Sequence, residues 1–90
     1  MPRWKATAIA DRKQITAYIA RDNPRAAREI GDMFISKAAF LDQYPTMGRL
    51  GRVKGTRELV VHSNYILVYR IIGQLVEILR VKHAAQKWPD

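Results

Sequence analysis

The stretch that decides the fold is Tyr65-Ile66-Leu67-Val68-Tyr69-Arg70-Ile71-Ile72-Gly73-Gln74-Leu75-Val76-Glu77-Ile78-Leu79-Arg80-Val81-Lys82. It contains two runs rich in Val, Ile, Leu and Tyr, residues that favour strands, and Gly73-Gln74 separates the runs as a turn. A third run of this kind, Glu58–His62, lies just upstream and ends at a second turn, Ser63-Asn64. Three short strands joined by tight turns predict an antiparallel meander.

Side chains along these strands should alternate between the two faces of the sheet, because successive strand residues point to opposite sides. On the middle strand, one face holds Tyr65, Leu67, Tyr69 and Ile71, and the other holds Ile66, Val68 and Arg70. On the last strand, one set is Leu75, Glu77, Leu79 and Val81, and the other is Val76, Ile78, Arg80 and Lys82. We expect helices to cover one face of the sheet and a basic set to occupy the exposed end of the other.

Two helices are predicted before the meander. Apolar residues recur at helical spacing after Thr7, which predicts a helix over residues 8–21 with Thr7 as its N-cap. Asn23 suits the N-cap of a second helix, and Pro24 suits its first position, where a missing N–H costs nothing. This second helix should run to about Tyr44, and Pro45 should stop it.

The remaining segments complete the predicted order of elements. The alternating segment Arg3–Thr7 predicts a first strand, and residues 45–56 carry one proline and three glycines, which predicts a loop. The fold class is therefore α+β: a strand, a two-helix hairpin and then the three-stranded antiparallel meander. With no repeat or linker, we expect one domain over residues 1–90.

Composition excludes several classes of protein. The chain has 90 residues, 48% of them hydrophobic, and no cysteine, so a disulfide framework and a thiolate metal site are excluded. His62 and His83 alone cannot supply a conventional zinc shell, and no motif indicates a cofactor. No apolar run approaches the ~20 residues that span a bilayer, and the N-terminus lacks a signal-peptide core. We therefore expect a cytoplasmic protein with no membrane partner.

The charge points to an anionic partner. Sixteen basic residues against eight acidic ones give a net charge of +8. The basic residues of the second half, which converge if the meander forms as predicted, are Arg49, Arg52, Lys54, Arg57, Arg70, Arg80, Lys82 and Lys87. They could form a groove for a polyanion or an acidic peptide, or merely a solvated surface. The few intervening carboxylates favour a target-binding groove.

His83 and the tryptophans are further candidates for function. His83 follows the last predicted strand, where it could act as a general acid or base, because histidine titrates near neutrality. A hydrogen-bonded structural histidine is an equally good interpretation. Trp4 and Trp88 could stack on nucleobases, although core packing is the favoured role for such rings in a small protein.

Several linked motifs resemble the RelE/ParE superfamily of toxins from bacterial type II toxin–antitoxin modules. They include Tyr18-Ile19-Ala20-Arg21-Asp22-Asn23-Pro24, Tyr44-Pro45-Thr46-Met47-Gly48-Arg49, Gly55-Thr56-Arg57-Glu58-Leu59-Val60-Val61 and Asn64-Tyr65-Ile66-Leu67-Val68-Tyr69-Arg70-Ile71, followed by Val76–His83. The resemblance covers almost the whole chain. It implies the α+β fold already predicted, and a cognate antitoxin, expected to be acidic and partly disordered, in a toxin–antitoxin hetero-oligomer.

The superfamily divides by target. ParE-like members poison DNA gyrase without catalysis, whereas RelE-like members cleave mRNA on the ribosome. Ribonuclease members generally carry an arginine before the Leu-Val-Tyr of the third strand, and here that position is Ile66. This departure favours the ParE-like branch. If the chain is instead a ribonuclease, its candidate catalytic residues are Arg57, Arg80, Lys82 and His83. A third possibility is a non-toxic basic protein that binds nucleic acid.

Overall fold

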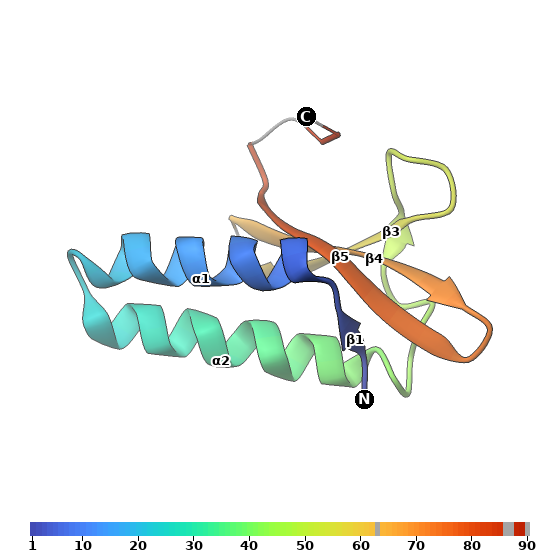
Figure 1. Cartoon of the computed structure of the whole chain (residues 1–90), viewed down its shortest axis with the longest axis horizontal. Coiled ribbons are helices and arrows are strands. Elements are labelled where there is room, and N and C mark those ends of the chain that lie inside the picture. The colour runs from blue at the N-terminus through green and yellow to red at the C-terminus, as the bar shows by residue number, and fades with distance from the viewer. Residues whose placement is uncertain (63, 86–87, 90) are drawn as a thin grey trace.

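The computed structural model describes residues 1–62, 64–85 and 88–89. Its elements, in chain order, are β1 (Arg3–Trp4), α1 (Ala6–Ala20), α2 (Pro24–Phe40), β2 (Arg49–Leu50), β3 (Arg57–His62), β4 (Tyr65–Ile72) and β5 (Leu75–His83). Figure 1 shows α1 and α2 side by side as a hairpin next to a twisted sheet. The α+β class and the predicted meander are confirmed.

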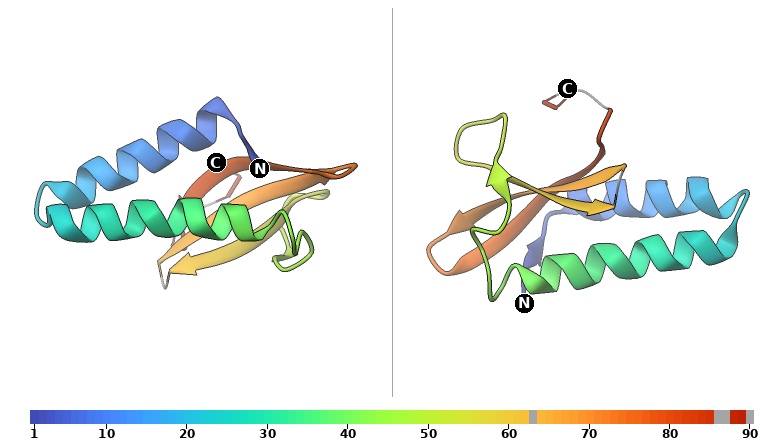
Figure 2. Two further views of the ribbon diagram at one scale, coloured as in Figure 1. Left: turned by 90° about the horizontal axis from the view of Figure 1, so that it is seen from below. Right: turned by 180° about the vertical axis from the view of Figure 1, so that it is seen from behind.

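Within the described residues, the sheet has five strands in the order β1-β5-β4-β3-β2. The β3, β4 and β5 strands form the antiparallel meander, and β1 pairs with β5 in parallel. The helical hairpin lies on one side of this sheet, as the two views in Figure 2 show. No helix in the described part of the chain is long and apolar enough to cross a membrane.

The first strand ends earlier than predicted, and the first helix begins earlier. Only Arg3 and Trp4 pair with β5, and α1 starts at Ala6 with Lys5 as its N-cap. Thr7 therefore does not cap the helix. Its hydroxyl instead donates to the Leu79 carbonyl at 2.9 Å. The strand is short because the first turn of α1 takes over the contact with the edge of β5.

The second helix begins as predicted and ends earlier. The Asn23 side chain accepts a hydrogen bond from Ala26 N at 3.1 Å, and Pro24 occupies the first turn, so both predictions are confirmed. The helix ends at Phe40 rather than near Tyr44. Between them the chain continues in tighter turns, because the amides of residues 41–43 bond to carbonyls three residues back.

The segment predicted as loop contains a strand. Arg49 and Leu50 form β2 and pair with Glu58 and Arg57 of β3. Two residues among glycines carry too weak an alternation to be predicted as a strand. The pairing exists because the tertiary fold brings this loop back to the edge of β3.

The core lies between the helical hairpin and the sheet. Its fully buried members include Phe34 and Leu41 near the end of α2 and Leu67, Tyr69 and Ile78 of the sheet. On β5, the core face holds Val76, Ile78 and Val81, so the strict alternation predicted for this strand, with Val76 and Ile78 opposite Val81, does not hold along its whole length.

A β-bulge explains this difference. Val68 pairs with Arg80, but the next residue, Tyr69, pairs with Ile78, so Leu79 is an extra residue on β5. The extra residue shifts the alternation by one. Val81 therefore turns into the core, whereas the predicted alternation places it on the same face as Glu77.

Candidate functional site: a basic sheet face and the cleft beside it

The face of the sheet turned away from the core carries four of the eight predicted target-binding residues, Arg49, Arg70, Arg80 and Lys82. Cross-strand partners share a face, so the register defines three rows across the strands. These rows are Arg3–Glu77–Arg70, Arg49–Glu58–Val68–Arg80 and Val60–Ile66–Lys82. We call these residues the basic face.

Two buried carboxylates organise the arginines of the basic face. Glu77, which is 4% exposed, accepts a hydrogen bond from Arg70 Nε at 2.7 Å. Arg70 Nη2 lies 2.7 Å from the same oxygen, and Arg3 Nε lies 3.9 Å from the other. The hydrogen bond from Arg70 holds the pKa of Glu77 below its ordinary value. The pairing fixes Arg70 in place and neutralises part of the positive charge.

Glu58 performs the same function at the other edge of the sheet. Its carboxylate lies 3.1 Å from Arg49 Nη2 and accepts a hydrogen bond from the Arg52 main-chain amide at 3.2 Å. Because Glu58 is 3% exposed, these contacts satisfy a carboxylate that would otherwise be costly to bury. They also fix the loop after β2 to the sheet.

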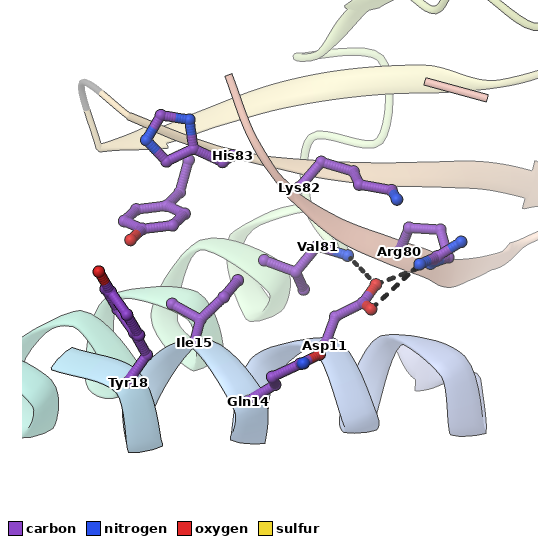
Figure 3. Close-up of a pocket in the computed structure, with 9 residues that line it drawn as sticks. Asp11, Gln14, Ile15, Tyr18, Arg80, Val81, Lys82 and His83 are labelled. Carbon is purple, nitrogen blue, oxygen red and sulfur yellow. Dashed lines mark hydrogen bonds and ion pairs between the residues drawn. The ribbon is translucent and has the colours of Figure 1, made fainter. Parts of the chain in front are cut away.

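Arg80 joins the last strand to the first helix. Its Nε lies 2.7 Å from Asp11 Oδ2 and its Nη2 lies 3.2 Å from Asp11 Oδ1. The Val81 amide also donates to Asp11 Oδ2, at 3.0 Å (Figure 3). Asp11 was not among the predicted site residues. The available signal was its spacing from Ile15 and Tyr18, four and seven residues on, which places all three on one helix face.

Trp88 lies over the end of the basic face. The Arg80 guanidinium is 5.9 Å and the Lys82 ammonium 5.8 Å from the centre of its ring, within cation–π range. Lys82 is only 4% exposed, so its charge is held inside the structure. Trp88 thus packs against basic residues, and Trp4 packs at the edge of the core with Arg12 4.5 Å from its ring centre.

A cleft of about 460 Å³ opens between α1 and the end of β5. Its lining residues are Asp11, Gln14, Ile15, Tyr18, Tyr65, Arg80, Val81, Lys82 and His83 (Figure 3). His83 stands edge-on to Tyr65 with ring centroids 5.3 Å apart, and its Nδ1 accepts a hydrogen bond from the Ala85 amide at 3.1 Å. Arg80 and Lys82 of the predicted groove therefore meet His83, the candidate acid or base, at one place.

Arg57 lies on the opposite face of the sheet. Its register partner is Tyr69, a core residue, whereas Arg80 pairs with Val68. Arg57 Nη1 donates to the carbonyls of Gly48 at 2.8 Å and Thr46 at 3.4 Å. Arg57 is thus engaged in holding the loop before β2.

The other predicted residues are distributed as follows. The structure brings Arg49, Arg70, Arg80 and Lys82 together on the basic face. Arg52 and Lys54 are exposed on the loop between β2 and β3. Lys87 lies outside the described residues.

Tyr69 is a structural centre that the residue pattern did not single out. Its hydroxyl donates to the Pro45 carbonyl at 2.6 Å and accepts from the Gly48 amide at 2.9 Å. Burial raises the pKa of this phenol. Its place on the core face was predictable from strand alternation, but its two partners in the loop were not.

The sequence of the chain is similar to those of known toxins. The sequence model of the ParE toxin of type II toxin–antitoxin systems (parDE) matches residues 3–88. The chain is 44% identical over 89 residues to Y4kP of Sinorhizobium fredii, covering 98% of this chain and 92% of that protein. It is 37% identical over 83 residues to Toxin RelE2 of Caulobacter vibrioides, covering 92% and 93% of the two chains.

A solved structure shares the fold. A chain of the chromosomal ParDE toxin–antitoxin system from P. aeruginosa superposes with a TM-score of 0.82 at 24% sequence identity. The match covers 90% of this chain and 91% of that one. From the family match and the two relatives, the protein is a member of the ParE toxin family, the toxin component of a type II toxin–antitoxin system.

Proposed function

We propose that this toxin inhibits DNA gyrase by binding to it, without catalysis, and that a cognate antitoxin neutralises it in the cytoplasm. The observation that carries the proposal is the state of the cations on the basic face. Arg49, Arg70 and Arg80 each pair with a carboxylate of the same chain, and these carboxylates are Glu58, Glu77 and Asp11. Such pairs suit a surface that recognises a partner.

A ribonuclease needs a different arrangement. Cleavage of RNA develops charge on the phosphate, and preorganised cations aimed at that charge are the main source of rate enhancement. Here the row through Ile66 has Val60 on one side and Lys82 on the other, so the position of the expected arginine is apolar. Arg57, the other main candidate, points into the loop on the opposite face.

Antitoxin binding follows from the same surface. We propose that an acidic, partly disordered antitoxin segment folds on contact with the toxin. The outer edge of β3 beyond Glu58 has no strand partner in the described residues, and Val60 on this edge is 50% exposed. A strand added here, or an amphipathic helix beside it, would combine main-chain hydrogen bonds with apolar burial and attraction to the basic face.

A RelE-like ribonuclease is the second candidate, because Arg80, Lys82 and His83 meet at the cleft beside α1. These residues could supply phosphate contacts and an acid or base. The third candidate, a non-toxic nucleic-acid-binding protein, would use the same cations. It predicts salt-sensitive affinity and unaffected growth on induction.

The decisive experiment is a gyrase supercoiling and DNA-cleavage assay with purified toxin, run beside an in vitro translation assay. Gyrase inhibition predicts loss of supercoiling or accumulation of cleaved DNA, with translation unaffected. A ribonuclease predicts the reverse. Translation arrest with normal gyrase activity would refute the proposal.

A further inference from the structure

A second surface lies away from the basic face, at the end of α2 and in the loop that follows. It is formed by Phe40, Tyr44, Met47 and Leu50, which we call the loop patch. Their exposed fractions are 41%, 51%, 53% and 77%. The rings of Phe40 and Tyr44 are 4.7 Å apart, and the Met47 amide donates to the Tyr44 carbonyl. Four large apolar side chains exposed within one short segment exceed the scattered exposure that needs no explanation.

The β2 end of the loop patch lies on the side of the sheet that faces the helices. Leu50 pairs in register with Arg57, whose other partner, Tyr69, is a core residue. Arg57 also bonds the carbonyls of Thr46 and Gly48, which flank Met47. The patch therefore follows one segment of the chain from the end of α2 to β2, and Leu50 at its β2 end lies on the face opposite the row through Ile66.

The segment that carries the loop patch is held in place by Tyr69 of β4 and by Thr56, which precedes β3. The Tyr69 hydroxyl bonds both Pro45 and Gly48, and a Cβ added to Gly48 would lie 2.7 Å from the Tyr69 ring. A Cβ on Gly51 would collide with the Thr56 hydroxyl. Because the loop has little freedom to lose, binding through it avoids most of the ordering cost that a mobile loop would incur.

The composition of this region identifies the kind of partner. Aromatic residues and methionine are enriched in the centres of protein interfaces, where acidic residues are depleted. The carboxylate within the segment, Asp42, is paired with the N-terminal amino group at 3.0 Å. Arg52 and Lys54 are exposed on the loop that follows. The surface therefore complements a folded protein that is apolar at the contact and acidic around it.

We infer that the loop patch is a second surface by which the toxin docks on its protein target, in addition to the basic face, and that the antitoxin does not cover this patch. The inference rests on the proposed function in one respect, namely that the target is a protein. A rigid, preformed patch suits a folded target, whereas a disordered antitoxin segment suits the open edge of β3 and the basic face.

The test compares two double variants. Met47→Glu/Leu50→Glu introduces charge into the loop patch. The matched control, Ile72→Glu/Leu75→Glu, changes residues that are 48% and 37% exposed on the hairpin between β4 and β5. Each is induced in cells at equal level, with growth, co-purification of the co-expressed antitoxin, and thermal unfolding measured. If the charged loop variant fails to fold, Met47→Ser/Leu50→Ser replaces it.

The loop variant should lose growth arrest while it retains antitoxin and folding, and the control should keep all three. Loss of anchor residues of this kind should weaken binding to purified gyrase by about tenfold or more. Full growth arrest by the loop variant, equal loss in the control, or loss of antitoxin binding would each overturn the inference. If wild-type toxin leaves gyrase unaffected, the proposed function fails, and the comparison of growth arrest still decides whether the loop patch is required.

Discussion

Asp11 and Arg80 are 69 residues apart in the chain and form a two-pronged ion pair, with Nε to Oδ2 at 2.7 Å and Nη2 to Oδ1 at 3.2 Å. Asp11 Oδ2 also accepts a hydrogen bond from the Val81 amide. A helix side chain thus supplies β5 with the acceptor that a neighbouring strand would otherwise provide. The pair fixes α1 to the strand that carries the cationic end of the cleft.

Asp11→Ala should lower the free energy of unfolding by about 2–3 kcal/mol, because it removes the ion-pair acceptor of a partly buried guanidinium and the hydrogen-bond acceptor of the Val81 amide. Asp11→Asn should cost less, since an amide oxygen can still accept from Val81. Urea unfolding followed by circular dichroism measures both. Glu29→Ala, on the exposed face of α2, is the control, and a loss of equal size there would contradict this prediction.

Tyr69→Phe should destabilise the protein by about 1–3 kcal/mol, because the Pro45 carbonyl and the Gly48 amide lose their buried partner. Tyr18→Phe, at a tyrosine that is 69% exposed, should change stability little. Thermal or urea unfolding distinguishes the two. Comparable melting of both variants with wild type would show that the loop is not anchored by this hydroxyl.

The same tyrosine predicts a loss of stability in alkali. Its folded-state pKa is raised above the ordinary value of 10.0, so the folded protein holds this proton more tightly than the unfolded chain does. The contribution is fully present below 10.0 and is lost as pH rises through the folded pKa. Unfolding measured at successive alkaline pH values should show this fall in wild type and a smaller one in Tyr69→Phe. Parallel curves would count against it.

Glu77 predicts a loss of stability in acid, whereas Tyr69 predicts a loss in alkali. Its folded-state pKa is lowered from 4.5, chiefly by the hydrogen bond from Arg70, so the unfolded chain takes up the proton first as pH falls. Its stabilisation is therefore present above 4.5 and is lost as pH falls through the folded pKa. Glu77→Gln should flatten the acid limb of a stability–pH curve, whereas Glu29→Gln should leave it unchanged. An unaltered limb in Glu77→Gln would argue that another group controls it.

His83→Ala should leave toxicity largely intact if no proton transfer depends on this histidine. Arg80→Ala and Lys82→Ala should instead weaken toxicity by degrees, most clearly when combined with Arg57→Ala. In a ribonuclease, removal of the acid or base or of the main phosphate cation would reduce turnover by orders of magnitude. Growth arrest on induction, at matched expression and with folding confirmed, is the measurement. Loss of toxicity confined to His83→Ala, with mRNA cleaved by wild type, would identify a ribonuclease.

The sequence by itself determined the elements and their order, except for the two-residue strand β2. Asn23-Pro24 predicted the start of α2, and the change from helical spacing to alternation before Glu58 predicted the meander. These signals are local, because caps, turns and periodicity depend on residues a few positions apart. The same alternation separated Leu67 and Tyr69 from Ile66, Val68 and Arg70, and the structure shows that Leu67 and Tyr69 lie on the core face.

Only the tertiary structure decided how the faces are completed. The bulge at Leu79 turns Val81 into the core, and it arises from the pairing of β4 with β5 rather than from any local signal at Leu79. Asp11 meets Arg80 across 69 residues, and Tyr69 meets Pro45 across 24. Contacts at such separations depend on how elements pack. A count of positive charges could therefore predict a basic surface, but only the packing determined which cations are paired with carboxylates and which hold a loop.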